Sequence, residues 1–152
     1  MKSLLTTLSI VTIIVIVAIS SMGSKPTRVT DSSKGINFHS GTWQEALDLA
    51  KKENKLIFLD VYASWCGPCK KLKSHTFSDA EVAKYYNSKF INVSADAEKG
   101  EGIQLANMYS VHQYPTLLFV NQDGKIVHST AGYHNSKQFL KLGQSIKQTN
   151  AD

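Results

Sequence analysis

The sequence predicts an α/β domain with a central mixed β-sheet flanked by helices. Nearly continuous apolar runs at residues 56–63, 90–95 and 117–120 indicate strands that are buried on both faces. Segments with helical apolar spacing separate these runs, as in domains whose helices cover a sheet. A turn at residues 121–124 then joins the last run to a returning antiparallel strand at 125–130.

Five helices are expected around this sheet. Two capping boxes predict helix starts, Thr42 with Glu45 and Ser78 with Glu81, because each hydroxyl can accept the backbone N–H three residues later. The expected helices cover residues 42–53, 70–74, 79–87, 103–109 and 135–148.

Length and charge narrow the classes of function. The chain has 152 residues and a formal net charge of +5, which fits one ordinary domain with an N-terminal appendage. The lysines are dispersed and form no basic stripe with aromatic residues, which argues against nucleic-acid binding. We expect a monomer that has no nucleic-acid partner.

The first residues predict export. After Lys2, residues 4–19 are uncharged and mostly apolar, with a few Thr and Ser, which is typical of a signal peptide with a minimal basic region. The run is slightly long for the apolar part of a signal peptide and short for a full membrane span, so residues 1–23 are either a signal peptide or an N-terminal membrane anchor. Residues 24–35 form a polar linker and residues 36–150 the folded domain. That domain would be periplasmic, or tethered to the outer face of the cytoplasmic membrane.

Both cysteines of the chain lie in the segment Trp65-Cys66-Gly67-Pro68-Cys69-Lys70, between a predicted strand and a predicted helix. Unpaired backbone N–H groups and the helix dipole favour a thiolate at Cys66, which makes it the candidate nucleophile. Cys69 lies one turn further into the helix, where we expect it to be better covered. From there it can resolve a mixed disulfide formed on Cys66.

Other uses of this cysteine pair have weaker support. A zinc site needs a second pair of ligands, but there are only 2 cysteines and the 5 histidines are scattered, so we expect no metal. A purely structural disulfide would close a loop too small to stabilise the fold much. A non-catalytic domain that binds a soft metal such as Cu(I) through both thiolates remains as an alternative of another class.

The dithiol segment, preceded by Asp60-Val61-Tyr62-Ala63-Ser64, resembles the active-site segment of thioredoxin. The resemblance implies the thioredoxin fold. It also implies that Asp60 transfers protons, accepting the proton of Cys69 as that thiol attacks a mixed disulfide. Burial in an apolar strand should raise the pKa of Asp60. Thioredoxin carries a lysine near this acid, but the run at 90–95 has none, so we expect Asp60 to lack a cationic partner.

Tyr114-Pro115-Thr116 is a second landmark, because a proline is awkward in the middle of a strand ladder. By the same resemblance, Pro115 is cis and faces the dithiol, and Tyr114 offers backbone groups to an extended substrate chain. A glycine at position 132 would let the substrate backbone approach. The resemblance therefore implies a docking surface for disulfide-containing protein substrates, made of Trp65, Gly67, Pro68, Tyr114, Pro115 and Gly132.

The segment Thr76-Phe77-Ser78-Asp79 is absent from classical thioredoxin. With residues 58–63 and the dithiol, it resembles the C-terminal periplasmic domain of the membrane reductase DsbD. This resemblance implies a membrane thiol carrier as electron donor. Gly67 and Pro68 are thioredoxin's own pair between the cysteines, which favours a protein-disulfide reductase that needs no bound cofactor. The alternative within the class is a disulfide oxidase or isomerase.

Overall fold

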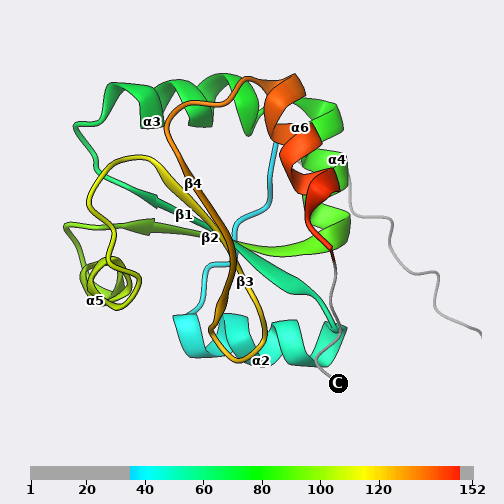
Figure 1. Ribbon diagram of the computed structural model, residues 1–152, viewed down its shortest axis with the longest axis vertical. Coiled ribbons are helices and arrows are strands. Elements are labelled where there is room, and N and C mark those ends of the chain that lie inside the picture. The colour runs from blue at the N-terminus through cyan, green and yellow to red at the C-terminus, as the bar shows by residue number, and fades with distance from the viewer. Residues whose placement is uncertain (1–34, 148–152) are drawn as a thin grey trace, which may run out of the picture. The chain divides into compact units, whose positions relative to one another are not determined.

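The computed structural model describes residues 35–147, and one mixed sheet lies at its centre (Figure 1). Its strands are β1 (Leu56–Tyr62), β2 (Phe90–Asp96), β3 (Thr116–Val120) and β4 (Ile126–Ala131). Their order in the four-stranded sheet is β2-β1-β3-β4, with β1 parallel to β2, β3 antiparallel to β1 and β4 antiparallel to β3. The helices are α2 (Trp43–Glu53), α3 (Gly67–Lys71), the π-helical turn η1 (Leu72–Thr76), α4 (Ala80–Lys89), α5 (Glu101–Met108) and α6 (Ser136–Ser145). The predicted fold class is confirmed.

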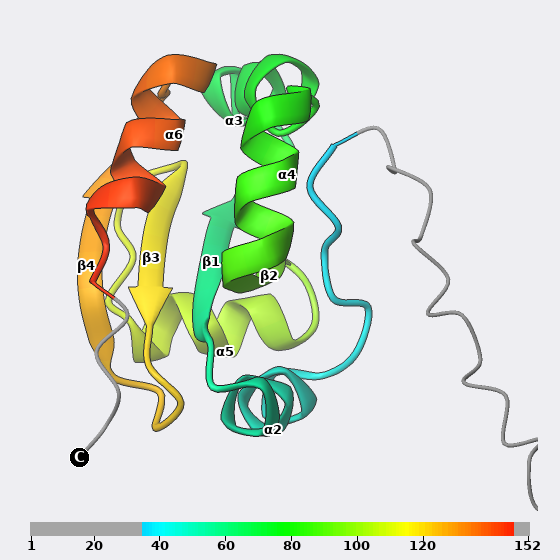
Figure 2. The same ribbon diagram turned by 90° about the vertical axis from the view of Figure 1, so that its right-hand side faces the viewer.

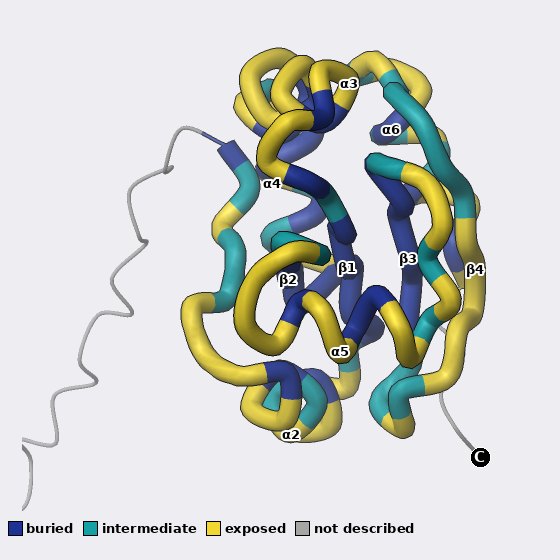
Figure 3. The backbone as a smooth tube through the Cα atoms, turned by 90° about the vertical axis from the view of Figure 1, so that its left-hand side faces the viewer, coloured by how far each residue is buried: buried dark blue, intermediate teal, exposed yellow. Residues whose placement is uncertain are grey.

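Helices cover both faces of the sheet. α2 and α5 pack on one face, while η1, α4 and α6 pack on the other (Figure 1, Figure 2). β1 and β3 are buried along nearly their whole length, whereas β4 is largely exposed at the sheet edge (Figure 3). The apolar sequences of β1 and β3 therefore reflect cover on both sides.

The face beneath α4 and α6 has a core of aromatic rings. Phe58 of β1 lies edge-on to Tyr86 of α4 with ring centroids 5.2 Å apart, and Phe139 of α6 stacks on Tyr86 at 4.2 Å. The Tyr86 hydroxyl donates a hydrogen bond of 2.9 Å to the carbonyl oxygen of Phe139, which satisfies its polar end inside the core. These contacts hold α6 against α4.

Side-chain caps set where the helices begin. The predicted capping box of Thr42 and Glu45 is present at α2. The predicted box of Ser78 and Glu81 is wrong, because α4 begins after Asp79, whose carboxylate accepts two backbone N–H groups of the first turn. A carboxylate there also places negative charge at the positive end of the helix dipole, an advantage that a serine hydroxyl lacks.

The helix that follows β1 is longer than the predicted 70–74 and changes its pitch. It begins at Gly67 and passes at Leu72 into the π-helical turn, in which the N–H of Phe77 donates to the carbonyl oxygen of Leu72 over 2.9 Å. This wider turn places Leu72 and Phe77 on the same side of the helix. Both side chains therefore reach the aromatic core.

The predictions for residues 1–23 and for most of the linker lie outside the described residues. The linker prediction overlaps the described chain at Gly35, whose carbonyl oxygen accepts a hydrogen bond of 3.3 Å from Asn87. Between residues 35 and 147, no helix has the length and apolar character needed to cross a membrane.

We expect Gly143→Ala to destabilise the domain, although alanine favours a helix. An added Cβ would lie 2.8 Å from Cε2 of the fully buried Tyr86 ring, which has no room to move aside. Overpacking of this kind costs about 1–3 kcal/mol, more than the gain of ~1 kcal/mol in helix propensity. Urea unfolding measures the change, with the exposed Gln144→Ala as control. Equal stability of the two variants would contradict this account of the packing.

Candidate active site

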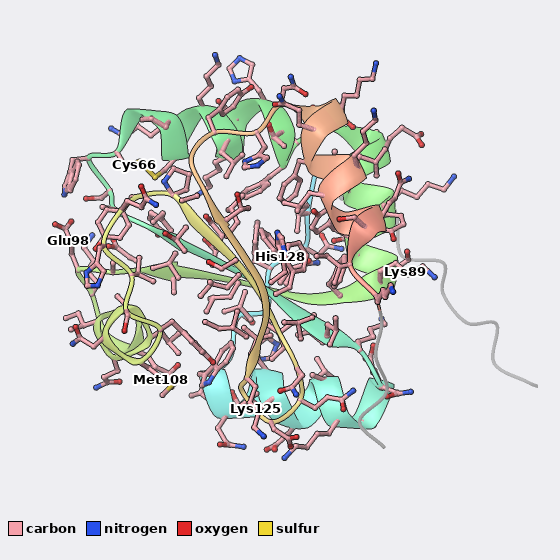
Figure 4. All side chains as sticks on the ribbon, in the orientation of Figure 1. Cys66, Lys89, Glu98, Met108, Lys125 and His128 are labelled. Atoms are coloured by element: carbon pink, nitrogen blue, oxygen red, sulfur yellow. A yellow bond between two sulfur atoms is a disulfide. The ribbon has the colours of Figure 1, made fainter. Side chains whose placement is uncertain are left out.

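The two cysteines form a disulfide where the chain passes from β1 into α3, with 2.05 Å between the sulfur atoms. Cys66 is the N-cap of α3 (Figure 4), and its Sγ accepts the backbone N–H of Cys69 over 3.1 Å. Pro68 occupies the first turn, where its missing N–H costs no helical hydrogen bond. This N–H donor and the start of the helix favour a thiolate on Cys66 when the disulfide is open.

The burial of the two cysteines differs from our prediction. Cys66 is 3% exposed and Cys69 is 7% exposed, so Cys69 is not the better covered of the two in the disulfide form. Tyr62 and Tyr114 pack against the cluster formed by the two cysteines and Ala63. Tyr114 comes from a distant segment of the chain, so the position of a cysteine within the helix does not predict this cover. Gly67 has open space where a side chain would extend, so the turn between the cysteines is accessible.

The peptide bond between Tyr114 and Pro115 is cis, as predicted. Pro115 immediately precedes β3, and its carbonyl oxygen accepts the N–H of Gly132 over 2.9 Å. Gly132 has a φ of 87°, in the left-handed region that favours glycine, and there is open space where a side chain would begin. Since Tyr114 packs against the cluster that contains both cysteines, the fold brings the segment with the cis proline to the dithiol.

Trp65 is 67% exposed beside the dithiol. Its indole N–H donates to Oε1 of Glu98 over 2.8 Å, and its ring lies edge-on to Tyr114 with centroids 6.0 Å apart. Cys66 and Glu98 lie on the same side of the molecule (Figure 4). Glu98 could not be predicted from the sequence, because it lies 33 residues from Trp65 and no motif marks the loop that carries it.

Asp60 lies in the apolar strand β1 and is only 5% exposed. The Ser94 hydroxyl donates to Oδ2 over 3.0 Å, whereas Oδ1 is buried without a hydrogen-bond partner among the described residues. Burial raises the pKa of Asp60 to about 7, and the Ser94 hydrogen bond opposes this rise. The predicted direction is confirmed, and this acid gains or loses its proton near neutral pH.

No ion pair of Asp60 occurs within residues 35–147, but a lysine that the sequence did not predict is near enough to influence its pKa. Burial is the largest influence on the pKa of Asp60, but the ammonium of Lys73 in η1 lowers that pKa. The neighbouring strand β2 carries no lysine beside Asp60, as the sequence indicated. The positive charge comes instead from the helix that packs on this face of the sheet.

A cavity of about 420 Å³ connects the buried acid with the dithiol. Asp60 and Ser94 line it from the strands, while Cys69, Lys70 and Lys73 line it from the helix. A space of this size has room for several water molecules, and Asp60 and Ser94 offer them polar partners. A proton can therefore pass between Cys69 and Asp60 through water.

Within residues 35–147, no three His, Cys, Asp or Glu side chains are grouped so that they could hold a metal ion. The hypothesis of soft-metal binding involves the two thiols alone and stays a prediction.

Comparison with known proteins identifies the family. Residues 43–147 match the family model of the thioredoxin-like domain. The chain belongs to the thioredoxin-like domain family. Thioredoxin-1 of Drosophila melanogaster is 36% identical over 95 residues, which cover 62% of this chain and 83% of that protein. The thiol:disulfide interchange protein DsbD of Pasteurella multocida is 33% identical over 103 residues, which cover 65% of this chain but only 18% of DsbD.

Solved structures agree with this family. A proposed disulphide-isomerase from Bacteroides thetaiotaomicron shares 42% identity at a TM-score of 0.64, covering 77% of this chain and 99% of that one. The reduced C-terminal domain of Neisseria meningitidis DsbD shares 27% identity at a TM-score of 0.57, covering 68% of this chain and 93% of that one. With the Cys66–Cys69 pair at disulfide distance, the domain has the fold of a thioredoxin-like thiol–disulfide oxidoreductase.

We expect Asp60→Asn to stabilise the oxidised protein at pH 8 but hardly at pH 4. The folded-state pKa of about 7 lies above the ordinary value of 3.8, so between these values the folded protein keeps a proton that the unfolded chain loses. The wild-type stability therefore falls as the pH rises through this window. Asparagine does not ionise, and the gain at pH 8 reaches at most about 4 kcal/mol.

Urea unfolding at both pH values measures this effect. Asp48→Asn, at an exposed position of α2, is the matched control, and we expect it to follow the wild-type pH dependence. If Asp60→Asn changed stability equally at pH 4 and pH 8, the raised pKa of Asp60 would be refuted.

Proposed function

We propose that this protein is a protein-disulfide reductase. The Cys66 thiolate attacks a disulfide of a substrate protein, one substrate sulfur leaves as a thiolate, and a mixed disulfide forms. Cys69 then attacks the Cys66 sulfur, which releases the second substrate sulfur and closes the Cys66–Cys69 bond. The substrate gains two electrons and the dithiol loses them. The observation that carries this proposal is the disulfide at the start of α3, connected by a cavity to a buried acid.

Asp60 would serve the second step. The Cys69 thiol must lose its proton before its sulfur can attack, and the cavity that Cys69 and Asp60 both line offers a route for that proton through water. A carboxyl group with a pKa of about 7 is well matched to accept a proton near neutral pH. The same group can return the proton when the disulfide is reduced again.

The substrate would dock around the dithiol. Gly67 leaves the turn open, and the exposed Trp65 ring beside Tyr114 offers apolar contact. These features support a docking surface for an extended disulfide-containing chain, composed of Trp65, Gly67, Pro68, Tyr114, Pro115 and Gly132.

A disulfide isomerase or oxidase is the alternative to the proposed reductase. The Gly67-Pro68 pair and the similarity to a thioredoxin support a reductase. The 42% identity with a proposed disulphide-isomerase supports an isomerase or oxidase instead. The reductase and the isomerase or oxidase would use the same two cysteines, but they differ in the reduction potential of the Cys66–Cys69 pair.

The place of action and the electron donor are further parts of the proposal. The mostly apolar residues 4–19 support export, with the domain in the periplasm or tethered to the outer face of the cytoplasmic membrane. The similarity to DsbD supports a membrane thiol carrier as donor, although this chain spans less than a fifth of the DsbD relative, 18%. We propose that the protein acts as a monomer.

We expect Cys69→Ser to trap substrate proteins as mixed disulfides. Without the second thiol, the bond between Cys66 and the substrate has no internal route to resolution. Incubating the full-length variant, in mild detergent, with an oxidised model substrate should give an adduct that a small thiol releases. Cys66→Ser is the control and should give none, because it lacks the attacking sulfur. Equal trapping by both variants would show that the roles of the two cysteines are misassigned.

We expect the reduction potential of the Cys66–Cys69 pair to lie near that of thioredoxin, about −270 mV, because the residues between the cysteines are the same. Equilibration of the full-length protein with thiol redox buffers measures it. A value of about −120 to −180 mV would instead establish an oxidase or isomerase. That result would reverse the direction and leave the assigned cysteines in place.

A further inference from the structure

The cavity beside the dithiol is lined by a residue that the proposed reaction does not yet use, Lys73. Lys73 lies in η1, four residues after Cys69, so the two side chains leave the helix on the same side and line the same space. Asp60 lines this space from β1. A thiol, a carboxyl group and an ammonium group from three consecutive elements therefore meet at one cavity.

The Asp60 carboxylate has few hydrogen-bond donors to stabilise its negative charge. Oδ2 accepts one hydrogen bond from Ser94, and Oδ1 is buried without a partner among the described residues. On the edge of β1 away from β2, Asp60 lies opposite the apolar Leu117 of β3, so no charged residue of β3 is paired with it. A buried carboxylate in this position depends on a positive charge nearby if it is to stay ionised.

Lys73 is placed to supply that charge. The ion pairs found within residues 35–147 join Lys55 to Glu53 and Lys99 to Asp96, and neither involves Lys73. Its ammonium is thus not neutralised by a carboxylate in direct contact and acts on Asp60 across the cavity. Burial raises the pKa of Asp60, and the charge of Lys73 works against that rise.

The other titratable groups at the cavity are Tyr62, Cys69 and Lys70. Burial raises the pKa of Tyr62, and the charges of Asp96 and Asp60 raise it further, so its hydroxyl is neutral at neutral pH. Lys70 lines the cavity closer to the start of α3. Among the charges at the cavity, Lys73 is the one that acts on Asp60.

We propose that Lys73 is a positioning residue for proton transfer from Cys69 to Asp60. Its ammonium keeps Asp60 ionised while the mixed disulfide is present, so that the carboxylate is ready to take the proton through water in the cavity. The S–H bond of Cys69 breaks and an O–H bond forms on Asp60. The new thiolate displaces the substrate sulfur from Cys66, and that sulfur takes a proton from solvent. This inference rests on the proposed reductase reaction and adds a residue to it.

The test compares Lys73→Met with Lys71→Met in the full-length protein. Lys71 carries the same charge on the same helix, but its Nζ lies 4.5 Å from the centroid of the Tyr133 ring, away from the cavity lining. The rate of reduction of a model protein disulfide is measured across the pH range. We expect the midpoint of the acid limb of the pH–rate profile to rise by roughly half a pH unit in Lys73→Met, because the Asp60 carboxylate loses a stabilising positive charge. Lys71→Met should leave the midpoint unchanged, and Lys73→Arg should restore it.

The Asp60→Asn background shows whether the effect passes through Asp60. There, Lys73→Met should cause no further shift, since the titrating group is gone. A shift that persists without Asp60, or coincident midpoints for Lys73→Met and Lys71→Met, would overturn the inference.

A second readout does not depend on activity. A carboxyl NMR titration of the oxidised protein should show the Asp60 midpoint rising in Lys73→Met and unchanged in Lys71→Met. If the wild-type protein reduces disulfides but the Asp60 midpoint is the same in both variants, the role of Lys73 alone is overturned. If the wild-type protein reduces no disulfide at any pH, the proposed function and this inference are both overturned.

Discussion

The burial of one carboxyl group, that of Asp60, is the constraint on which the rest of the site depends. Helices on both faces of the sheet bury β1, and the Asp60 carboxyl group receives one hydrogen bond from a protein side chain, that of Ser94. Water is a much better solvent for a carboxylate than this interior, so the pKa of the group moves up to about 7. The buried Asp60 therefore lowers the stability of the domain at neutral pH. Such a destabilising residue is typical of a functional site rather than of a packed core.

The direction of one strand decides what faces the dithiol. β3 runs antiparallel to β1, with Thr116 opposite Val61 near the end of β1. The cis Pro115, which precedes Thr116, therefore lies beside the point where the chain leaves β1 for Cys66. A parallel β3 would have placed its first residue beside the start of β1, at the opposite end of the sheet. The two sequence landmarks meet because the sheet is mixed.

The helix formed by α3 and η1 joins this chemistry to the core. Leu72 is fully buried in the aromatic core and anchors the helix at the change of pitch. The side that carries Cys69 and Lys73 faces the cavity, while Lys71 lies over the Tyr133 ring. Because the anchor fixes the rotation of the helix, the thiol and the ammonium are held relative to the buried acid without a direct contact among them.

The resemblance to thioredoxin predicted the cis proline, and local patterns in the chain were enough to predict the strands, the first helix cap, the dithiol and the buried acid. These features depend on residue type and on near neighbours, so spacing reveals them. The contact of Glu98 with Trp65 and the charge of Lys73 near Asp60 emerged only once the chain was folded. They join separate elements through long side chains, whose direction is set by packing, and no local pattern specifies where such side chains end. The sequence thus specified the reacting groups, and the packing of helix on sheet set their electrostatic surroundings.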